Sequence, residues 1–141
     1  MPKASHSVQV KAPVETVWRL LLDKIENPGA YVPDVTAVQI LERQPGYVVR
    51  QMTAGGIEVT ERITAFARSH EVDYVLMDHP VYAGQVVNRI EPPLQPGLSC
   101  TLTFTLDWRR KDGQPDRLDL QPNIVQAVEA TKALAERQAR V

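Results

Sequence analysis

The feature that most constrains this chain is a run of short, strand-like segments separated by brief turns. β-Branched and aromatic residues gather between residues 35 and 110, and Gly, Pro and Asp interrupt them repeatedly. Most interruptions span only a few residues, whereas a parallel strand pair needs a crossover of about a dozen. We therefore expect consecutive strands to pair antiparallel, as a meander. The expected strands cover residues 36–42, 47–53, 57–67, 72–77, 82–90 and 98–109.

A strand and a helix are expected before this meander. Apolar and polar residues alternate over residues 7–11, which is the period of a half-buried strand. Pro13 ends that alternation and suits the first helical position, because the first amide groups of a helix lack partners within it. Apolar residues then recur at helical spacing, which predicts a helix over residues 13–25. Asn-Pro-Gly at 27–29 ends this helix, and residues 30–33 form either a second short helical turn or a loop.

A long helix is expected at the end of the chain, from Pro122 onward. Its apolar and small residues, Ile124 and Val128 among them, share one face opposite a charged face. The predicted class is α+β: a curved antiparallel sheet of about seven strands wrapped around a long C-terminal helix, with one or two short helices between strands 1 and 2. We expect residues 1–141 to form a single domain, because the length suits one core and no linker or repeat interrupts it.

Composition excludes several classes of partner. The chain has 16 Lys and Arg against 17 Asp and Glu, so it lacks the basic character typical of nucleic-acid binding. Cys100 is the only cysteine and the three histidines are scattered, so neither a metal nor a cofactor is expected. No apolar stretch approaches the roughly 18 residues of a membrane span, and the N-terminus lacks a signal-peptide core. We expect a cytoplasmic protein without a nucleic-acid partner.

Strand phase places two charged side chains inside the fold. Gly55 and Gly56 suit a two-residue turn that requires positive φ, and counting outward from that turn pairs Arg50 with Glu61. The apolar residues of both strands share the phase of these two charges, so this phase faces the interior. A buried, unpaired charge is very costly, which favours an ion pair between the two. The apolar residues on this phase are Val48, Met52, Ile57, Val59 and Ile63.

The same phase rule completes a predicted ligand site. Tyr74 and Asn88 turn inward on the next two strands, which adds two polar groups to the ion pair. An apolar wall with a few convergent polar groups is typical of a small-molecule site. Structural alternatives stay open: the ion pair can serve stability alone, the aromatic residues can be core, and Asn88 can satisfy a buried backbone group. The candidate ligand-binding residues are Arg50, Glu61, Tyr74, Asn88, Met52, Phe104, Trp108 and Val128.

Two segments resemble a known superfamily. Residues 8–18, Val-Gln-Val-Lys-Ala-Pro-Val-Glu-Thr-Val-Trp, and residues 31–35, Tyr-Val-Pro-Asp-Val, resemble the START/Bet v 1-like helix-grip (SRPBCC) superfamily, as does the order of elements. Residues 59–63 and 84–90 are similar to its AtaL-like branch, whose members are largely uncharacterised. The resemblance implies a cavity between sheet and terminal helix that holds a mostly apolar ligand. It implies no single activity, because relatives include lipid carriers, hormone receptors, polyketide cyclases, aromatases and co-chaperones.

Three functions are compatible with these observations. The first is binding of a small hydrophobic molecule with a polar group, in which Arg50 meets an anionic or carbonyl oxygen. The second is a polyketide cyclase- or aromatase-like enzyme with Glu61 as general acid/base and Arg50 as oxyanion stabiliser, although a facing cation makes a carboxylate a weaker base. The third is a protein-interaction module similar to the co-chaperones, which a solidly packed cavity would favour. An exposed edge strand could also pair two copies into a homodimer.

Overall fold

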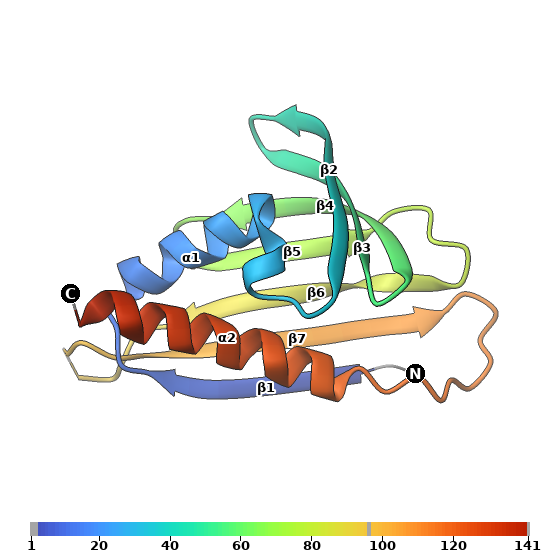
Figure 1. Cartoon of the computed structure of the whole chain (residues 1–141). Helices are drawn as coiled ribbons and strands as arrows, with labels where there is room; N and C mark the ends of the chain where they lie inside the picture. Colours follow the sequence, from blue (N-terminus) through green and yellow to red (C-terminus); the bar gives the residue numbers. More distant parts are fainter. Residues whose placement is uncertain (1–2, 96, 141) are drawn as a thin grey trace.

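The chain forms one curved antiparallel sheet with helices on its concave face (Figure 1). The computed structural model describes residues 3–95 and 97–140. The strand order is β1-β7-β6-β5-β4-β3-β2, so the first strand closes the sheet beside the last one. The elements are β1 Lys3–Val10, α1 Val14–Glu26, η1 Pro28–Ala30, β2 Val35–Gln44, β3 Tyr47–Ala54, β4 Ile57–Phe66, β5 Glu71–Leu76, β6 Tyr82–Glu91, β7 Cys100–Arg110 and α2 Gln121–Ala139. The predicted helix-grip class is confirmed.

The hairpin between β3 and β4 has the predicted register. Gly55 and Gly56 adopt φ of 57° and 78°, the left-handed conformation that a two-residue hairpin turn requires. Arg50 lies opposite Glu61, as counting from the turn predicts. Because side chains alternate between the faces of a strand, this register places both charges on the concave face.

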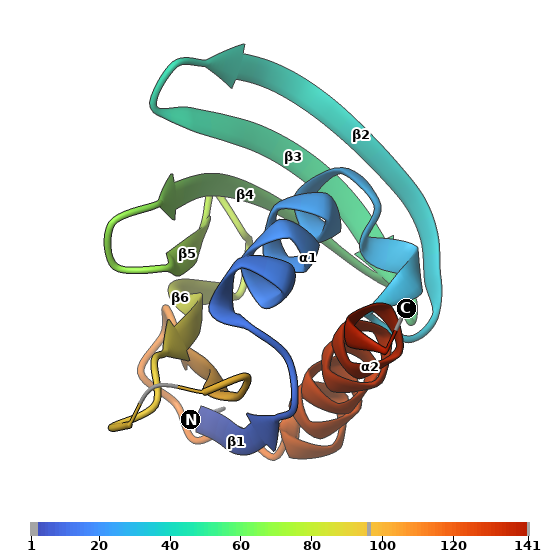
Figure 2. The ribbon, with the colours of Figure 1, turned by 90° about the vertical axis from the view of Figure 1, so that its left-hand side faces the viewer.

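The two longer helices bury their apolar faces inside the curve of the sheet. Figure 2 shows the sheet bending around α1 and α2. Val17 and Leu21 of α1 and Val128 and Thr131 of α2 are fully buried. The core therefore lies between the concave face and these helices, where an amphipathic helix removes its apolar stripe from water. No helix in the described segments has the length and apolar character needed to cross a bilayer.

Two helix boundaries differ from the prediction. Pro13 is the N-cap of α1 and not its first helical residue, because its ψ of 153° is extended. Its carbonyl oxygen accepts hydrogen bonds from the amides of Thr16 and Val17, which are among the amide groups that a helix start leaves free. The short second helix covers Pro28–Ala30, since Pro28 fits the first turn of a helix. Residues 31–33 follow it as a loop, which is the second of the two predicted alternatives.

Candidate ligand-binding site

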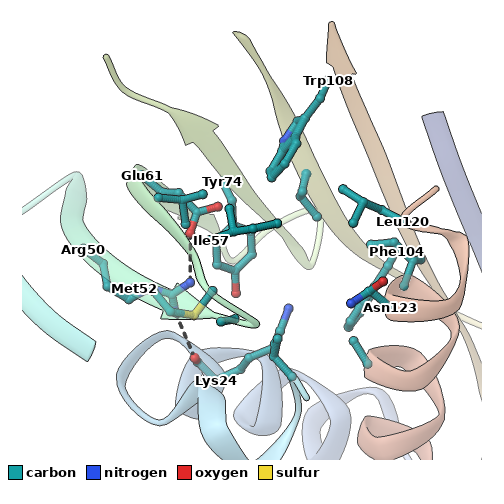
Figure 3. Close-up of a pocket in the computed structure, with 16 residues that line it drawn as sticks. Lys24, Arg50, Met52, Ile57, Glu61, Tyr74, Phe104, Trp108, Leu120 and Asn123 are labelled. Carbon is teal, nitrogen blue, oxygen red and sulfur yellow. Dashed lines mark hydrogen bonds and ion pairs between the residues drawn. The ribbon is translucent and has the colours of Figure 1, made fainter. Parts of the chain in front are cut away.

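A cavity of about 150 Å³ lies between the sheet and α2. Figure 3 shows side chains from β3, β4, β5, β7 and both longer helices pointing into it. Ile57 lines the cavity and is 39% exposed, so the wall reaches solvent beside the β3–β4 turn. Most of the wall is apolar, and this part consists of Val32, Met52, Ala54, Ile57, Val59, Val86, Phe104, Trp108, Leu120, Ile124 and Ala127.

Arg50 links the sheet to the end of α1. Its Nη2 donates to Glu61 Oε1 at 3.0 Å, and its Nη1 donates to the carbonyl oxygens of Lys24 and Ile25 at 3.2 and 3.0 Å. These carbonyls belong to the last turn of α1, where a helix leaves acceptors without intrahelical donors and favours positive charge. Both side chains of the ion pair are almost completely buried. The pair therefore connects the end of α1 to β3 and β4, and both side chains also line the cavity.

Lys24 is a buried cation that the sequence reasoning missed. It lies on α1, is only 5% exposed, and its Nζ donates to Asn88 Oδ1 at 2.6 Å. The ring of Tyr74 lies 4.7 Å from Nζ and the ring of Phe104 lies 4.3 Å away, distances at which aromatic faces attract a cation. The signal was present, because Lys24 falls seven residues after Val17 and therefore on the apolar stripe of the helix.

The surroundings of Lys24 disfavour its protonated form. Burial in an apolar environment, reinforced by repulsion from Arg50 and partly opposed by attraction from Glu61, lowers the pKa of Lys24 to about 7. In residues 3–95 and 97–140 no carboxylate pairs with this amine, and Glu61 is engaged by Arg50. When Lys24 is protonated, the group formed by Lys24, Arg50 and Glu61 therefore contains two cations and one carboxylate.

Two further polar groups have no partner at the cavity wall. Within the described residues, neither the Tyr74 hydroxyl nor the indole Nε1 of Trp108 forms a hydrogen bond, although both atoms are buried. Buried polar groups are nearly always paired, so each unpaired one needs an explanation. Burial raises the pKa of Tyr74, which keeps its hydroxyl protonated and able to donate. A ligand oxygen would satisfy such a donor.

Some of the predicted site residues line the cavity, and others lie behind its wall. Arg50, Glu61, Tyr74, Met52, Phe104 and Trp108 line the cavity. Asn88 and Val128 are fully buried but are not part of its wall. The side-chain oxygen of Asn88 lies behind Lys24 and accepts a hydrogen bond from its amine. Asn88 therefore pairs with a side chain, whereas the structural alternative expected it to pair with a buried backbone group.

The sequence reasoning also left out the residues that α2 contributes to the wall. Asn123, Ile124 and Ala127 line the cavity from the start of this helix, together with Leu120 just before it. Helical spacing could have placed Ile124 and Ala127 on the inner face, but not opposite a particular strand. Within the described residues no group of three or more His, Cys, Asp or Glu could hold a metal ion.

Comparisons with known proteins agree with this architecture. The family model described as "Polyketide cyclase / dehydrase and lipid transport" matches residues 1–139. The Zhui aromatase/cyclase from Streptomyces sp. R1128 has a TM-score of 0.80 and 23% identity, with 99% of this chain and 96% of that chain covered. The protein TTHA0849 from Thermus thermophilus has a TM-score of 0.72 and 13% identity, with 98% and 99% covered.

A START superfamily protein from Mycobacterium smegmatis has a TM-score of 0.65 and 17% identity, with 98% of this chain and 97% of that chain covered. A search of curated proteins found no match. Such identities show the fold and not the activity, and membership of the AtaL-like branch stays a prediction. The helix-grip architecture, the cavity under α2 and the family model together show that this chain belongs to the polyketide cyclase/dehydrase and lipid transport family.

Proposed function

We propose that the protein binds a small, mainly apolar molecule that carries an oxygen-bearing polar group. The observation that carries this proposal is a cavity wall that is mostly apolar and contains a few polar side chains. Among these, Lys24 and the unpartnered hydroxyl of Tyr74 lie close together. Sites of this composition hold a ligand by apolar contact and orient it with a few polar groups.

Cavity volume limits the size of the ligand. The volume is about 150 Å³, which is below the roughly 300–1,000 Å³ of most drug-sized sites. An apolar cavity of about this size accommodates benzene. A ligand that fits without widening the cavity is therefore about the size of one aromatic ring, or is an aliphatic molecule of similar volume.

The arrangement also orients such a ligand. Its oxygen faces Lys24 and Tyr74, and its ring packs toward Trp108 and Leu120. An acceptor oxygen there receives hydrogen bonds from the amine and the hydroxyl, and both are stronger in a site that excludes water. Toluene, which lacks an oxygen, fills the same apolar space but leaves both donors unsatisfied.

A titration with ring-matched probes tests the proposal. Toluene, benzyl alcohol and benzaldehyde are titrated while tryptophan fluorescence is recorded, because Trp108 lines the cavity. We expect the two oxygen-bearing probes to bind about tenfold or more tightly than toluene, which corresponds to one hydrogen bond of about 1.4 kcal/mol. Lys24→Met should remove most of this preference, whereas Lys11→Met, at an exposed lysine outside the cavity, should keep it. Equal affinities for all three probes, or no binding at all, would contradict the proposal.

A cyclase-like enzyme is the second candidate. The family match and the likeness to an aromatase/cyclase favour it, with Glu61 as general acid/base and Arg50 as oxyanion stabiliser. The hydrogen bond from Arg50 to Glu61 Oε1 argues against this assignment, because it already occupies a carboxylate oxygen that a general base must offer to the substrate. Comparing Glu61→Gln with the wild-type protein on small polyketide-like substrates tests it, and equal rates would remove Glu61 from catalysis.

The remaining expectations stay predictions. An open cavity supports ligand binding over the interaction-module alternative, which a solid core would have favoured. β2 is an edge strand whose Val38 and Leu41 are exposed, so it remains a candidate for homodimer pairing. From the sequence we also propose a single domain, a cytoplasmic location and no nucleic-acid partner.

A further inference from the structure

We propose that Lys24 forms a reversible covalent imine with a carbonyl group of the bound molecule, so that the ligand class is small apolar aldehydes and ketones. This inference rests on the proposed function, because the carbonyl must first enter the cavity. It adds a chemical step at one atom, the Nζ of Lys24. It does not depend on Glu61 as a catalytic base.

The placement of the amine supports this step. Nζ lines the cavity between the rings of Tyr74 and Phe104 and makes one hydrogen bond, to the neutral amide of Asn88. No ion pair with a carboxylate of the described residues holds it in the ammonium form. A lysine that is desolvated and lies near another cation is activated as a nucleophile, and Arg50 supplies that cation.

The charged and polar groups around Lys24 explain why a reactive amine persists near neutral pH. Arg50 faces it from β3, Glu61 from β4, Tyr74 from β5 and Asn88 from β6. With a pKa of about 7, about half of the amine is neutral at pH 7, against roughly one in 3,000 for a lysine at its usual pKa of 10.5. Neutral amine is therefore enriched on the order of 10³-fold over an exposed lysine.

The reaction balances without an external oxidant or reductant. The Nζ lone pair attacks the carbonyl carbon, a C–N bond forms as the C–O π bond breaks, and one proton moves from nitrogen to the former carbonyl oxygen to give a carbinolamine. The remaining C–O bond then breaks, the second Nζ proton goes to the departing oxygen, which leaves as water, and a neutral imine with a C=N bond remains. The Tyr74 hydroxyl, whose pKa burial raises, is the donor that faces the oxygen before it leaves. Addition of water reverses the sequence and releases the carbonyl compound.

Reductive trapping with benzaldehyde tests the inference. The whole chain is incubated at pH 7 with benzaldehyde and sodium cyanoborohydride, which reduces an imine to a stable secondary amine, and the products are mapped by peptide mass spectrometry. Among the lysine side chains we expect Lys24 to gain its benzyl group first, at a rate at least about 100-fold above that of the exposed lysines. The rate at Lys24 should rise with pH and show an inflection near pH 7.

Matched variants show whether the modification depends on the location of Lys24 or on the reactivity of lysines in general. Lys24→Met should lose the benzyl group, Lys11→Met should retain it, and Tyr74→Phe should slow its formation several-fold. If Lys24→Met does not fold, the peptide map of the wild-type protein still decides the question, because it identifies the modified lysine directly.

The two experiments distinguish failure of the imine proposal from failure of the proposed binding function. If benzaldehyde changes the tryptophan fluorescence but Lys24 gains no benzyl group, the imine is overturned and the proposed function stands. If benzaldehyde neither binds nor modifies Lys24, both are overturned. Benzyl groups spread over all lysines at similar rates would also overturn the imine, since that pattern needs no special amine.

Discussion

Lys24 shows how one residue can reverse its expected behaviour when the fold places it in an apolar site. A lysine on a helix is normally solvated, yet this one lies under two aromatic rings and beside a guanidinium. Burying its charged form lowers the free energy of unfolding. The amine lies at the cavity wall, where a bound ligand can contact it. Arg50 contrasts with it, because an ion pair and two helix carbonyls compensate its charge.

The lowered pKa of Lys24 predicts a pH dependence of stability. Between pH 7 and 10.5 the unfolded chain holds the Lys24 proton and the folded chain has lost it, so the free energy of unfolding rises with pH across this window. The free energies of unfolding of wild type and Lys24→Met can be measured in urea at several pH values. Between pH 7 and 9 the value for wild type should increase by about 2 kcal/mol more than the value for the variant. A difference between wild type and Lys24→Met that stays constant over this pH range would contradict the lowered pKa of the buried amine.

At the scale of elements, turn chemistry and strand phase explain most of the sheet. The Gly-Gly turn sets the β3–β4 register, and alternation then decides which side chains face the helices. Helix ends were less predictable, because Pro13 fits both the N-cap and the first helical position. Lys24 was missed for a related reason: a helical stripe identifies a face but does not say whether a long polar side chain on it reaches water.

The packing of β6 against β7 requires glycine at position 84. Its φ is +136°, and an added Cβ would lie 2.1 Å from the carbonyl oxygen of Asp107 on the neighbouring strand β7. Gly84→Ala should therefore lower the free energy of unfolding by at least about 2 kcal/mol in urea titrations. Gly46→Ala is the control, since a Cβ there meets nothing within 4 Å. Equal stability of the two variants would show that β6 can shift away from β7.

At the scale of the whole molecule, the cavity results from closing a curved sheet over two helices. β1 completes the sheet beside β7, and α2 packs against both of these strands. The start of α2 forms one wall of the cavity, while the rest of the helix fills the core. The same helix therefore provides both a binding surface and a large part of the hydrophobic stabilisation.

This division of α2 predicts opposite effects for two similar substitutions. Ala127 lines the cavity, so Ala127→Leu should fill it, abolish binding of the ring-matched probes, and leave the melting temperature unchanged or raised. Ala135 is fully buried outside the cavity wall, so Ala135→Leu should overpack the core and cost about 1–3 kcal/mol. Probe binding that survives Ala127→Leu would place the ligand elsewhere.

Sequence alone determined the antiparallel meander, the hairpin register and the pairing of Arg50 with Glu61. Each depends on local rules: short connections, period-two alternation, and glycines at a turn. Only the tertiary structure decided which inward residues surround empty space, that Asn88 lies behind the wall, and that Lys24 from α1 meets side chains of three strands. The physical reason is that cavity shape and the desolvation of an amine depend on how distant elements pack, and no local pattern in the chain records that packing.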